Sequence, residues 1–234
     1  MKNFRTTIIA ALLMMTGTAA VAQDTVETTV SADLVSRYIW RGMELAKAAV
    51  QPTLGVAYKG VSLSAWGSYG IMEGTDTDEL DLTLSYNTGG LTVGVTDYWF
   101  SGGDNRYFLY DAHKTAHVFE AFLGYDFGKV SATWYTNFAG ADGVNKDGKR
   151  AYSSYVELAA PFTLGGLDWT ATVGAVPFAS SYYEDATGFA VTNVTLGATK
   201  DLKITDSFSL PVFARVTANP SSQKMFFTLG LTIE

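Results

Sequence analysis

The chain has 234 residues, no cysteine, and an aromatic content of 14% that includes 13 tyrosines and 14 phenylalanines. Its 16 basic and 23 acidic residues give a net charge of −7, which disfavours a nucleic-acid partner because phosphate binding needs a basic surface. The lack of cysteine excludes a disulfide-stapled miniprotein. The many aromatic residues therefore need another explanation.

Residues 1–22 have the pattern of a secretory signal peptide. Two basic residues precede an apolar run at 8–15, and small residues follow up to the expected cleavage site. The run is shorter than the ~20 residues that span a bilayer, so we expect removal rather than anchoring. The mature chain, residues 23–234, then has 14 basic and 23 acidic residues and a net charge of −9.

Apolar residues in the mature chain recur at every second position rather than at helical spacing. From Val61 to Ile71, Val, Leu, Ala, Gly, Tyr and Ile alternate with Ser, Ser, Trp, Ser and Gly. Such a period of two is typical of strands with one apolar and one polar face. The pattern predicts twelve strands, at 27–40, 50–59, 61–71, 79–88, 90–100, 116–127, 129–139, 151–164, 167–177, 189–200, 206–217 and 223–234.

The connections between these strands alternate in length. Short turns are expected at 59–60, 88–90, 128–129, 164–166 and 201–205, and longer links at 41–49, 72–78, 101–115, 140–150, 178–188 and 218–222. Short turns at one end and long loops at the other are typical of bacterial outer-membrane barrels. We therefore predict an all-β fold, a transmembrane antiparallel up-and-down β-barrel of about 12 strands spanning residues 23–234.

The aromatic residues fit this layout. On the apolar register they gather near the long loops, as at Tyr38 and Trp40, and near the short turns, as at Tyr58 and Tyr86. Two aromatic girdles around an aliphatic band mark the two membrane interfaces of a barrel. A soluble sandwich or lipocalin-like barrel is the alternative, although strands of about ten residues are long for a sandwich. Asp97 falls in the outward register, so we expect a bulge there or a position at headgroup depth.

Residues 34–43, Leu-Val-Ser-Arg-Tyr-Ile-Trp-Arg-Gly-Met, together with 50–54 and 60–68, resemble the start of the TorF-type porin family of Gram-negative outer membranes. The Ser-Arg-Tyr-Ile-Trp-Arg-Gly string is the specific part. The resemblance implies an outer-membrane location and a pore role. It brings no catalytic or ligand residues to carry over.

If the apolar face meets lipid, the other face lines the lumen. The charged residues of that face are Asp33, Arg37, Arg41, Asp81, Glu120, Asp126, Glu157, Asp168 and Arg215. Six acids against three bases would favour cations in a permeable path. We expect seven of these residues to line the pore, namely Asp33, Arg37, Arg41, Asp81, Glu120, Glu157 and Arg215.

The same charges allow a second interpretation, because buried charges are retained only when they are partnered. Arg37 and Arg215 facing Asp33, Glu120 and Glu157 would then brace the wall or plug a narrow barrel. A barrel of twelve strands lies between a filled eight-stranded barrel and an open porin. Small lumen residues, among them Gly94 and Gly174, are expected to leave space and so favour a pore.

A lipid-active enzyme is the rival class. A serine nucleophile needs a histidine base, and the chain has only His113 and His117. Ser101 could approach them only by loop folding, so loop histidines without a catalytic role are the simpler interpretation. The acids Glu73, Asp76, Asp78 and Glu79 crowd one loop that could hold Ca²⁺, although a solvated loop is the simpler interpretation here too.

We therefore expect a porin-like outer-membrane channel for passive diffusion of small solutes, with a preference for cations. The alternative is a non-conducting outer-membrane barrel, either a lipid-active enzyme or a surface interaction protein. The expected partners are outer-membrane lipids, small solutes and the barrel-assembly machinery, and no nucleic acid. No cofactor, metal or catalytic residue is expected.

Overall fold

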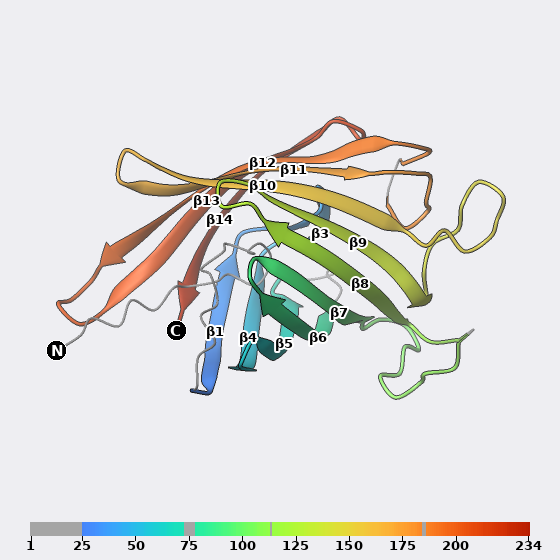
Figure 1. Ribbon diagram of the computed structural model, residues 1–234, viewed down its shortest axis with the longest axis horizontal. Coiled ribbons are helices and arrows are strands. Elements are labelled where there is room, and N and C mark those ends of the chain that lie inside the picture. The colour runs from blue at the N-terminus through green and yellow to red at the C-terminus, as the bar shows by residue number, and fades with distance from the viewer. Residues whose placement is uncertain (1–24, 73–77, 113, 184–185) are drawn as a thin grey trace.

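The computed structural model describes residues 25–72, 78–112, 114–183 and 186–234, and in these residues twelve antiparallel strands form a closed barrel (Figure 1). Each strand pairs with the neighbouring barrel strands along the chain, and β1 closes the ring against β14. The barrel strands are β1 (Glu27–Val35), β4 (Ala49–Tyr58), β5 (Val61–Gly70), β6 (Glu79–Thr88), β7 (Leu91–Phe100), β8 (His117–Asp126), β9 (Ser131–Gly140), β10 (Ser154–Leu164), β11 (Leu167–Val176), β12 (Ala190–Lys203), β13 (Ser209–Asn219) and β14 (Lys224–Ile233). The predicted all-β, twelve-stranded, up-and-down barrel is confirmed.

No helix in these described ranges is long and apolar enough to span a membrane. The expected signal peptide, residues 1–22, lies outside the described residues and stays a prediction.

The short turns have the backbone geometry of tight hairpins. Lys59–Gly60, Gly89–Gly90 and Gly165–Gly166 each have positive φ at both residues. This is the requirement of a type I′ turn, whose twist matches that of the paired strands. The long connections lie at the opposite end, except that the last link, between β13 and β14, is only the tight turn 220–223.

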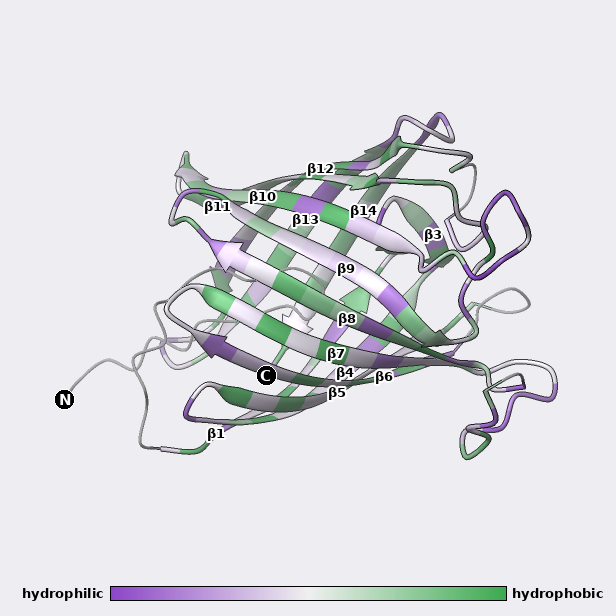
Figure 2. Cartoon of the chain, turned by 45° about the vertical axis from the view of Figure 1, so that its right-hand side comes forward, coloured by the Kyte–Doolittle hydropathy of each residue, from purple (hydrophilic) through white to green (hydrophobic). Residues whose placement is uncertain are grey.

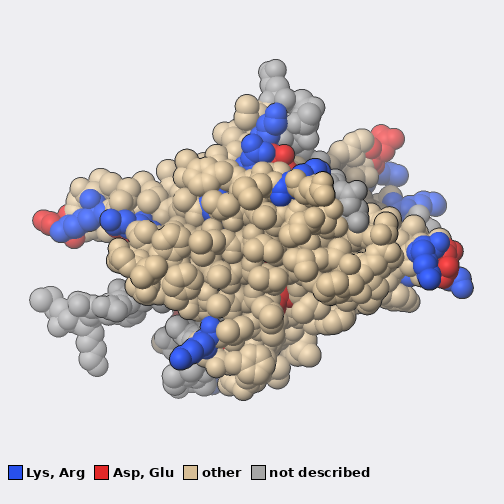
Figure 3. Space-filling view, turned by 90° about the horizontal axis from the view of Figure 1, so that it is seen from above, with Lys and Arg blue, Asp and Glu red and all other residues tan. Residues whose placement is uncertain are grey.

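The outer wall is apolar. Leu54, Leu63, Leu84 and Leu123 are among the exposed large hydrophobic residues, with relative exposures between 49% and 58%. Figure 2 shows hydrophobic residues alternating with more polar ones along the strands, and the broad middle of the face in Figure 3 carries few charged side chains. An exterior of this kind suits lipid contact, because a soluble barrel would expose polar residues there.

One predicted strand is wrong. The segment 27–40 was expected to be continuous, but β1 ends at Val35 and the chain then turns into the barrel. There, β2 (Tyr38–Trp40) and β3 (Met43–Ala46) form a separate two-stranded sheet, which we call the inner hairpin. Strand β1 ends at two hydrogen bonds between Ser36 and Leu229 on β14. The amide of Ser36 donates to the carbonyl of Leu229 (2.8 Å), and the Ser36 hydroxyl, in place of a backbone carbonyl, accepts from the Leu229 amide (2.9 Å).

The inner hairpin also overturns part of the aromatic girdle. Tyr58 and Tyr86 are exposed on the outer wall near the short turns, as predicted. Tyr38 and Trp40 were placed on the outer wall as well, but they are 3% and 9% exposed and lie in the barrel interior. The period of two continued through them because the inner hairpin is itself a strand pair.

Candidate functional site in the barrel lumen

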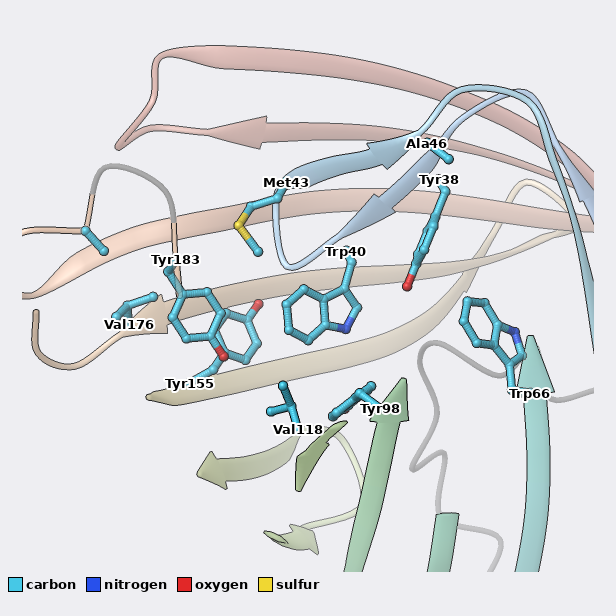
Figure 4. Close-up of a cluster of buried hydrophobic side chains, with 11 residues drawn as sticks. Tyr38, Trp40, Met43, Ala46, Trp66, Tyr98, Val118, Tyr155, Val176 and Tyr183 are labelled. Carbon is cyan, nitrogen blue, oxygen red and sulfur yellow. The ribbon is translucent and has the colours of Figure 1, made fainter. Parts of the chain in front are cut away.

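The inner hairpin crosses the lumen near the end with the long loops. Figure 4 shows its side chains, Tyr38, Trp40 and Met43, among aromatic residues of the surrounding strands. The Tyr38 ring meets Trp66 of β5 edge-on, with centroids 5.5 Å apart. Trp40 stacks on Tyr183, from the 177–189 loop, at a centroid distance of 6.0 Å. The hairpin therefore packs aromatic side chains inside the lumen at this level.

The tip of the inner hairpin is a two-residue turn, Arg41–Gly42, with φ angles of 49° and 82°. A Cβ added to Gly42 would lie 1.8 Å from the carbonyl oxygen of Thr192 on β12. The Gly42 carbonyl accepts a hydrogen bond of 3.1 Å from the side chain of Asn219 on β13. Glycine is required here both for its backbone conformation and for this close approach to the wall.

Arg41 fixes the tip to the opposite wall. Its Nη1 and Nη2 donate to the two carboxylate oxygens of Glu120 on β8, at 2.6 and 2.8 Å. Nη1 also donates to the hydroxyl of Tyr183 at 2.6 Å, and the hydroxyl of Tyr98 donates to Glu120 at 2.9 Å. The side chains of Arg41 and Glu120 are 6% and 0% exposed. A two-pronged charged pair of this kind is strong and geometrically specific.

Aromatic faces surround the same guanidinium. Its carbon lies 4.3 Å from the ring centroid of Trp40, 4.3 Å from that of Tyr135 and 4.7 Å from that of Tyr155. These are cation–π distances, and the exclusion of water strengthens such contacts. Arg41 is thus held by a carboxylate, a hydroxyl and three rings.

The electrostatics keep this group charged. Burial alone lowers the pKa of the Arg41 guanidinium, but the charge of Glu120 outweighs it, and the pKa lies above its ordinary value. Burial raises the pKa of the Tyr183 phenol, so its hydroxyl stays neutral and accepts from Arg41. The Arg41 guanidinium therefore keeps its charge inside the lumen.

Two acids lie beside the base of the inner hairpin. Glu79 and Asp81 on β6 are 6% and 9% exposed, and the Tyr38 hydroxyl hydrogen-bonds to Glu79. Asp81 Oδ1 is buried without a hydrogen-bond partner among the described residues. Glu79 was predicted in an acidic loop, but it begins β6 and faces the lumen. Glu73 and Asp76 of that loop lie outside the described residues.

Further lumen charges lie lower on the wall. Asp33 accepts from the Thr232 hydroxyl at 2.6 Å, and Glu157 accepts from the Tyr155 hydroxyl at 3.1 Å. The Arg215 guanidinium lies over the Phe213 ring, 4.3 Å from its centroid.

The structure therefore places the seven predicted pore-lining residues in three ways. Five belong to barrel strands and face the lumen, namely Asp33, Asp81, Glu120, Glu157 and Arg215. Arg41 enters the lumen from the tip of the inner hairpin rather than from a wall strand. Arg37 lies at the base of the hairpin, is 37% exposed, and pairs with Glu44 at 2.5 Å instead of facing Asp33, Glu120 or Glu157. Whether any of them borders a permeation path stays a prediction.

The glycines of the lumen do not leave the expected space. A Cβ added to Gly94 would lie 2.4 Å from the Phe122 ring, and one on Gly174 would lie 1.7 Å from the Tyr155 hydroxyl. A Cβ on Gly230 would likewise lie 2.2 Å from the Phe213 ring. An aromatic ring from a neighbouring strand covers each glycine, so the expectation that Gly94 and Gly174 leave space in the lumen is wrong.

His117, one of the two histidines considered for an enzyme, pairs with Asp97 instead. His117, at the start of β8, lies on the outer side of the wall with Asp97, and its Nδ1 is hydrogen-bonded to Asp97 Oδ1 at 2.7 Å. Its Nε2 donates to the backbone carbonyl of Tyr107 at 2.6 Å. Both ring nitrogens are occupied, so neither is available to a serine hydroxyl. Asp97 thus keeps its predicted outward register without a bulge, and the partner that sequence reasoning missed is His117. His113 lies outside the described residues.

Sequence reasoning missed the tyrosines around Arg41. Tyr98 and Tyr135 lie on the polar register of β7 and β9, where small residues such as Ser and Thr dominate the other strands. Large aromatic residues on a lumen face were the available signal that something in the lumen packs against them.

Comparisons with known proteins place the chain in a family. A family model described as a bacterial protein of unknown function, Gcw_chp, matches residues 19–219. The chain belongs to the Gcw_chp family. This match does not confirm the TorF-type name that the Ser36–Gly42 string suggested. A search of curated proteins finds no match.

Three solved structures are similar in fold to this member of the Gcw_chp family. One described as KdgM porin is 9% identical over 88% of this chain and 98% of that chain, with a TM-score of 0.46. One described as NanC porin is 9% identical over 87% and 98%, with a TM-score of 0.45. The COG4313 outer membrane channel from Pseudomonas putida F1 is 14% identical over 89% and 96%, with a TM-score of 0.44. Likeness at this level carries no information on solute or mechanism.

Proposed function

We propose that this chain is an outer-membrane, porin-like channel for small solutes whose passage is narrowed by the inner hairpin. The observation that carries the proposal is the two-faced wall: a closed ring of twelve strands with leucine and valine outside and charged and hydroxyl side chains inside. In a bilayer, only a closed sheet satisfies every backbone group of its strands. In porins, a polar interior of this kind lines a water-filled channel.

The lumen charges support a preference for cations. Glu79, Asp81 and Glu157 face the interior, and no ion pair with a basic residue is seen for them in the described part of the chain. Arg215 is the one basic side chain on the face of a barrel strand among the seven predicted pore-lining residues. An excess of carboxylates raises the local concentration of cations along the path. We propose outer-membrane lipids, small solutes and the barrel-assembly machinery as the partners.

Planar-bilayer recording of the refolded protein tests the proposal. Discrete conductance steps above the lipid background, with a reversal potential shifted toward cation selectivity in a salt gradient, are the expected result. A folded barrel, verified by its gel mobility before and after boiling, that gives no steps would contradict a channel. Steps with anion selectivity would contradict the role given to the acids.

A further inference from the structure

The surroundings of Arg41 form a complete binding site of their own. Tyr135, Tyr155 and Tyr183 contact the Arg41 guanidinium, and Tyr98 donates to its partner Glu120; we call the four tyrosines and Glu120 the cation cage. They come from β7, β8, β9, β10 and the 177–189 loop, so none belongs to the inner hairpin. The cage therefore stands on the barrel, and its occupant, Arg41, is supplied by a separate segment.

The chemistry of the cation cage matches a planar guanidinium. The Glu120 carboxylate accepts both prongs at 2.6 and 2.8 Å, which suits a fork of two N–H groups better than a single ammonium. The Tyr183 hydroxyl takes a further N–H at 2.6 Å, and the rings of Tyr135 and Tyr155 lie 4.3 and 4.7 Å from the cation. Aromatic faces with a buried carboxylate are a general means of binding organic cations.

Arg41 belongs to the inner hairpin, a segment that has little stability by itself. The inner hairpin has strands of three and four residues, and isolated two-stranded hairpins are marginally stable. Its other ion pair, Arg37–Glu44, is exposed and worth little in water. The hairpin is therefore seated by its contacts with the barrel, and the bonds of Arg41 in the cation cage are the charged ones among them. A ligand that satisfies the cage equally well would compete with that seating.

The nearby acids add to this site. Asp81, with an unpartnered Oδ1, and Glu79 lie in the same interior, and Glu157 hydrogen-bonds to Tyr155 of the cage. Carboxyl oxygens accept hydrogen bonds from N–H groups, so a guanidinium solute finds further acceptors at the level of the lumen that the inner hairpin occupies.

We propose that the cation cage is a binding site for the guanidinium group of small solutes, and that Arg41 occupies it as an internal ligand. A guanidinium solute takes the place of Arg41 on Glu120 and unseats the inner hairpin. The inference rests on the proposed function, since it names the solute class of that channel. The test of the guanidinium site measures binding, whereas the test of the channel measures conductance. Either proposal can therefore be contradicted while the other stands.

The test asks whether an added guanidinium compound restores the stability that the full-length, refolded protein loses when Arg41 is removed. Arg41→Ala removes the internal ligand and keeps all five cage residues. Guanidinium chloride and methylguanidinium at millimolar concentration are the probes. Urea has the same shape without charge, and tetramethylammonium has the charge without the N–H fork. Thermal unfolding in detergent and titration calorimetry report binding.

Guanidinium and methylguanidinium are expected to raise the unfolding midpoint of Arg41→Ala, while urea and tetramethylammonium do not. Arg41→Ala with Glu120→Gln should bind them about tenfold more weakly or not at all, because a charge-assisted pair is lost. Arg37→Ala is the matched control, since it removes an arginine of the same hairpin outside the cage, and guanidinium should not rescue it. Equal effects of guanidinium and urea, equal rescue of Arg37→Ala, or a preference for tetramethylammonium would overturn the proposal.

A second measurement needs no variant and keeps the proposal testable if Arg41→Ala does not fold. In the wild-type barrel, added methylguanidinium should speed amide hydrogen exchange of Ile39 and Met43 relative to the same concentration of urea. Exchange of barrel strands such as β12 should be unchanged. Hairpin exchange that does not respond to methylguanidinium contradicts displacement of Arg41. Binding of guanidinium compounds without measurable conductance would support the binding site and contradict the proposed channel.

Discussion

Arg41 and Glu120 form a two-pronged ion pair, at 2.6 and 2.8 Å, although 79 positions separate them in the sequence. The pair joins the tip of the inner hairpin to β8 on the far side of the lumen. Both side chains are almost fully buried, so each charge depends on the other. The contact therefore holds the tip of the hairpin in its position inside the lumen.

Breaking the pair should destabilise the barrel strongly. Arg41→Ala and Glu120→Ala are each expected to lower the free energy of unfolding by about 3–5 kcal/mol, because each leaves a buried charge without a partner. The double variant should cost less than the sum of the two. Arg37→Ala, which breaks the exposed pair with Glu44, should cost about 1 kcal/mol or less. Urea unfolding in detergent measures all four, and equal losses for Arg41→Ala and Arg37→Ala would contradict the account.

The turn of the inner hairpin should not tolerate a side chain at Gly42. Alanine there would place its Cβ 1.8 Å from the Thr192 carbonyl and would also adopt a positive φ. Gly89→Ala is the matched control, since Gly89 also has positive φ but no atom within 4 Å of an added Cβ. We expect Gly42→Ala to lower the thermal midpoint more than Gly89→Ala, measured by circular dichroism. Equal losses would mean that only the backbone conformation matters at Gly42.

The ring of Phe213 should prevent any side chain larger than hydrogen at position 230. All three atoms nearest to a Cβ on Gly230 belong to that ring, at 2.2 to 2.8 Å. Gly230→Ala is expected to cost about 1–3 kcal/mol by overpacking. Adding Phe213→Ala removes the clash, so the double variant should be more stable than the sum of the two single losses predicts. Additive losses in a double-mutant cycle would show that the two residues do not interact.

Asp97 and His117 should hold the 101–116 loop against the outer wall. Asp97→Ala removes the hydrogen-bond partner of His117 Nδ1 and leaves a buried ring nitrogen unpaired, at a cost of about 1–3 kcal/mol. The loop carries Arg106, so trypsin cleavage after this residue should be faster in Asp97→Ala than in wild type. Asp168→Ala, at an exposed position of β11, is the control and should cleave at the wild-type rate. Unchanged cleavage in Asp97→Ala would mean that the pair does not restrain the loop.

The wall of the barrel was predictable, whereas the content of its lumen was not. The alternation from Val61 gave β5, Val61–Gly70, almost to the residue, because a two-faced wall imposes a period of two on every strand. Tyr38 and Trp40 carry the same period, and periodicity does not distinguish an apolar residue facing lipid from one facing a packed interior. The bond of Ser36 to Leu229 that ends β1 joins residues 193 positions apart.

The partners of the site residues could not be predicted from the sequence either. Charge counting found Arg41 and Glu120 as lumen residues, but their pairing depends on the inward turn at Arg41–Gly42. The Trp-Arg-Gly-Met string contains a turn signal, since glycine at its third position suits positive φ. Within a run that looks like a continuous strand, that signal was read as the end of the strand rather than as the tip of a hairpin.

The most direct test of the account is the single-channel conductance of a variant whose inner hairpin is replaced. Residues 37–47 are exchanged for a Gly-Ser linker of equal length, so that the connection between β1 and β4 keeps its length but loses its seat in the lumen. Gel mobility before and after boiling verifies that the barrel is closed. The account predicts larger conductance steps than in the wild-type barrel, and steps of wild-type size from a folded variant would contradict it.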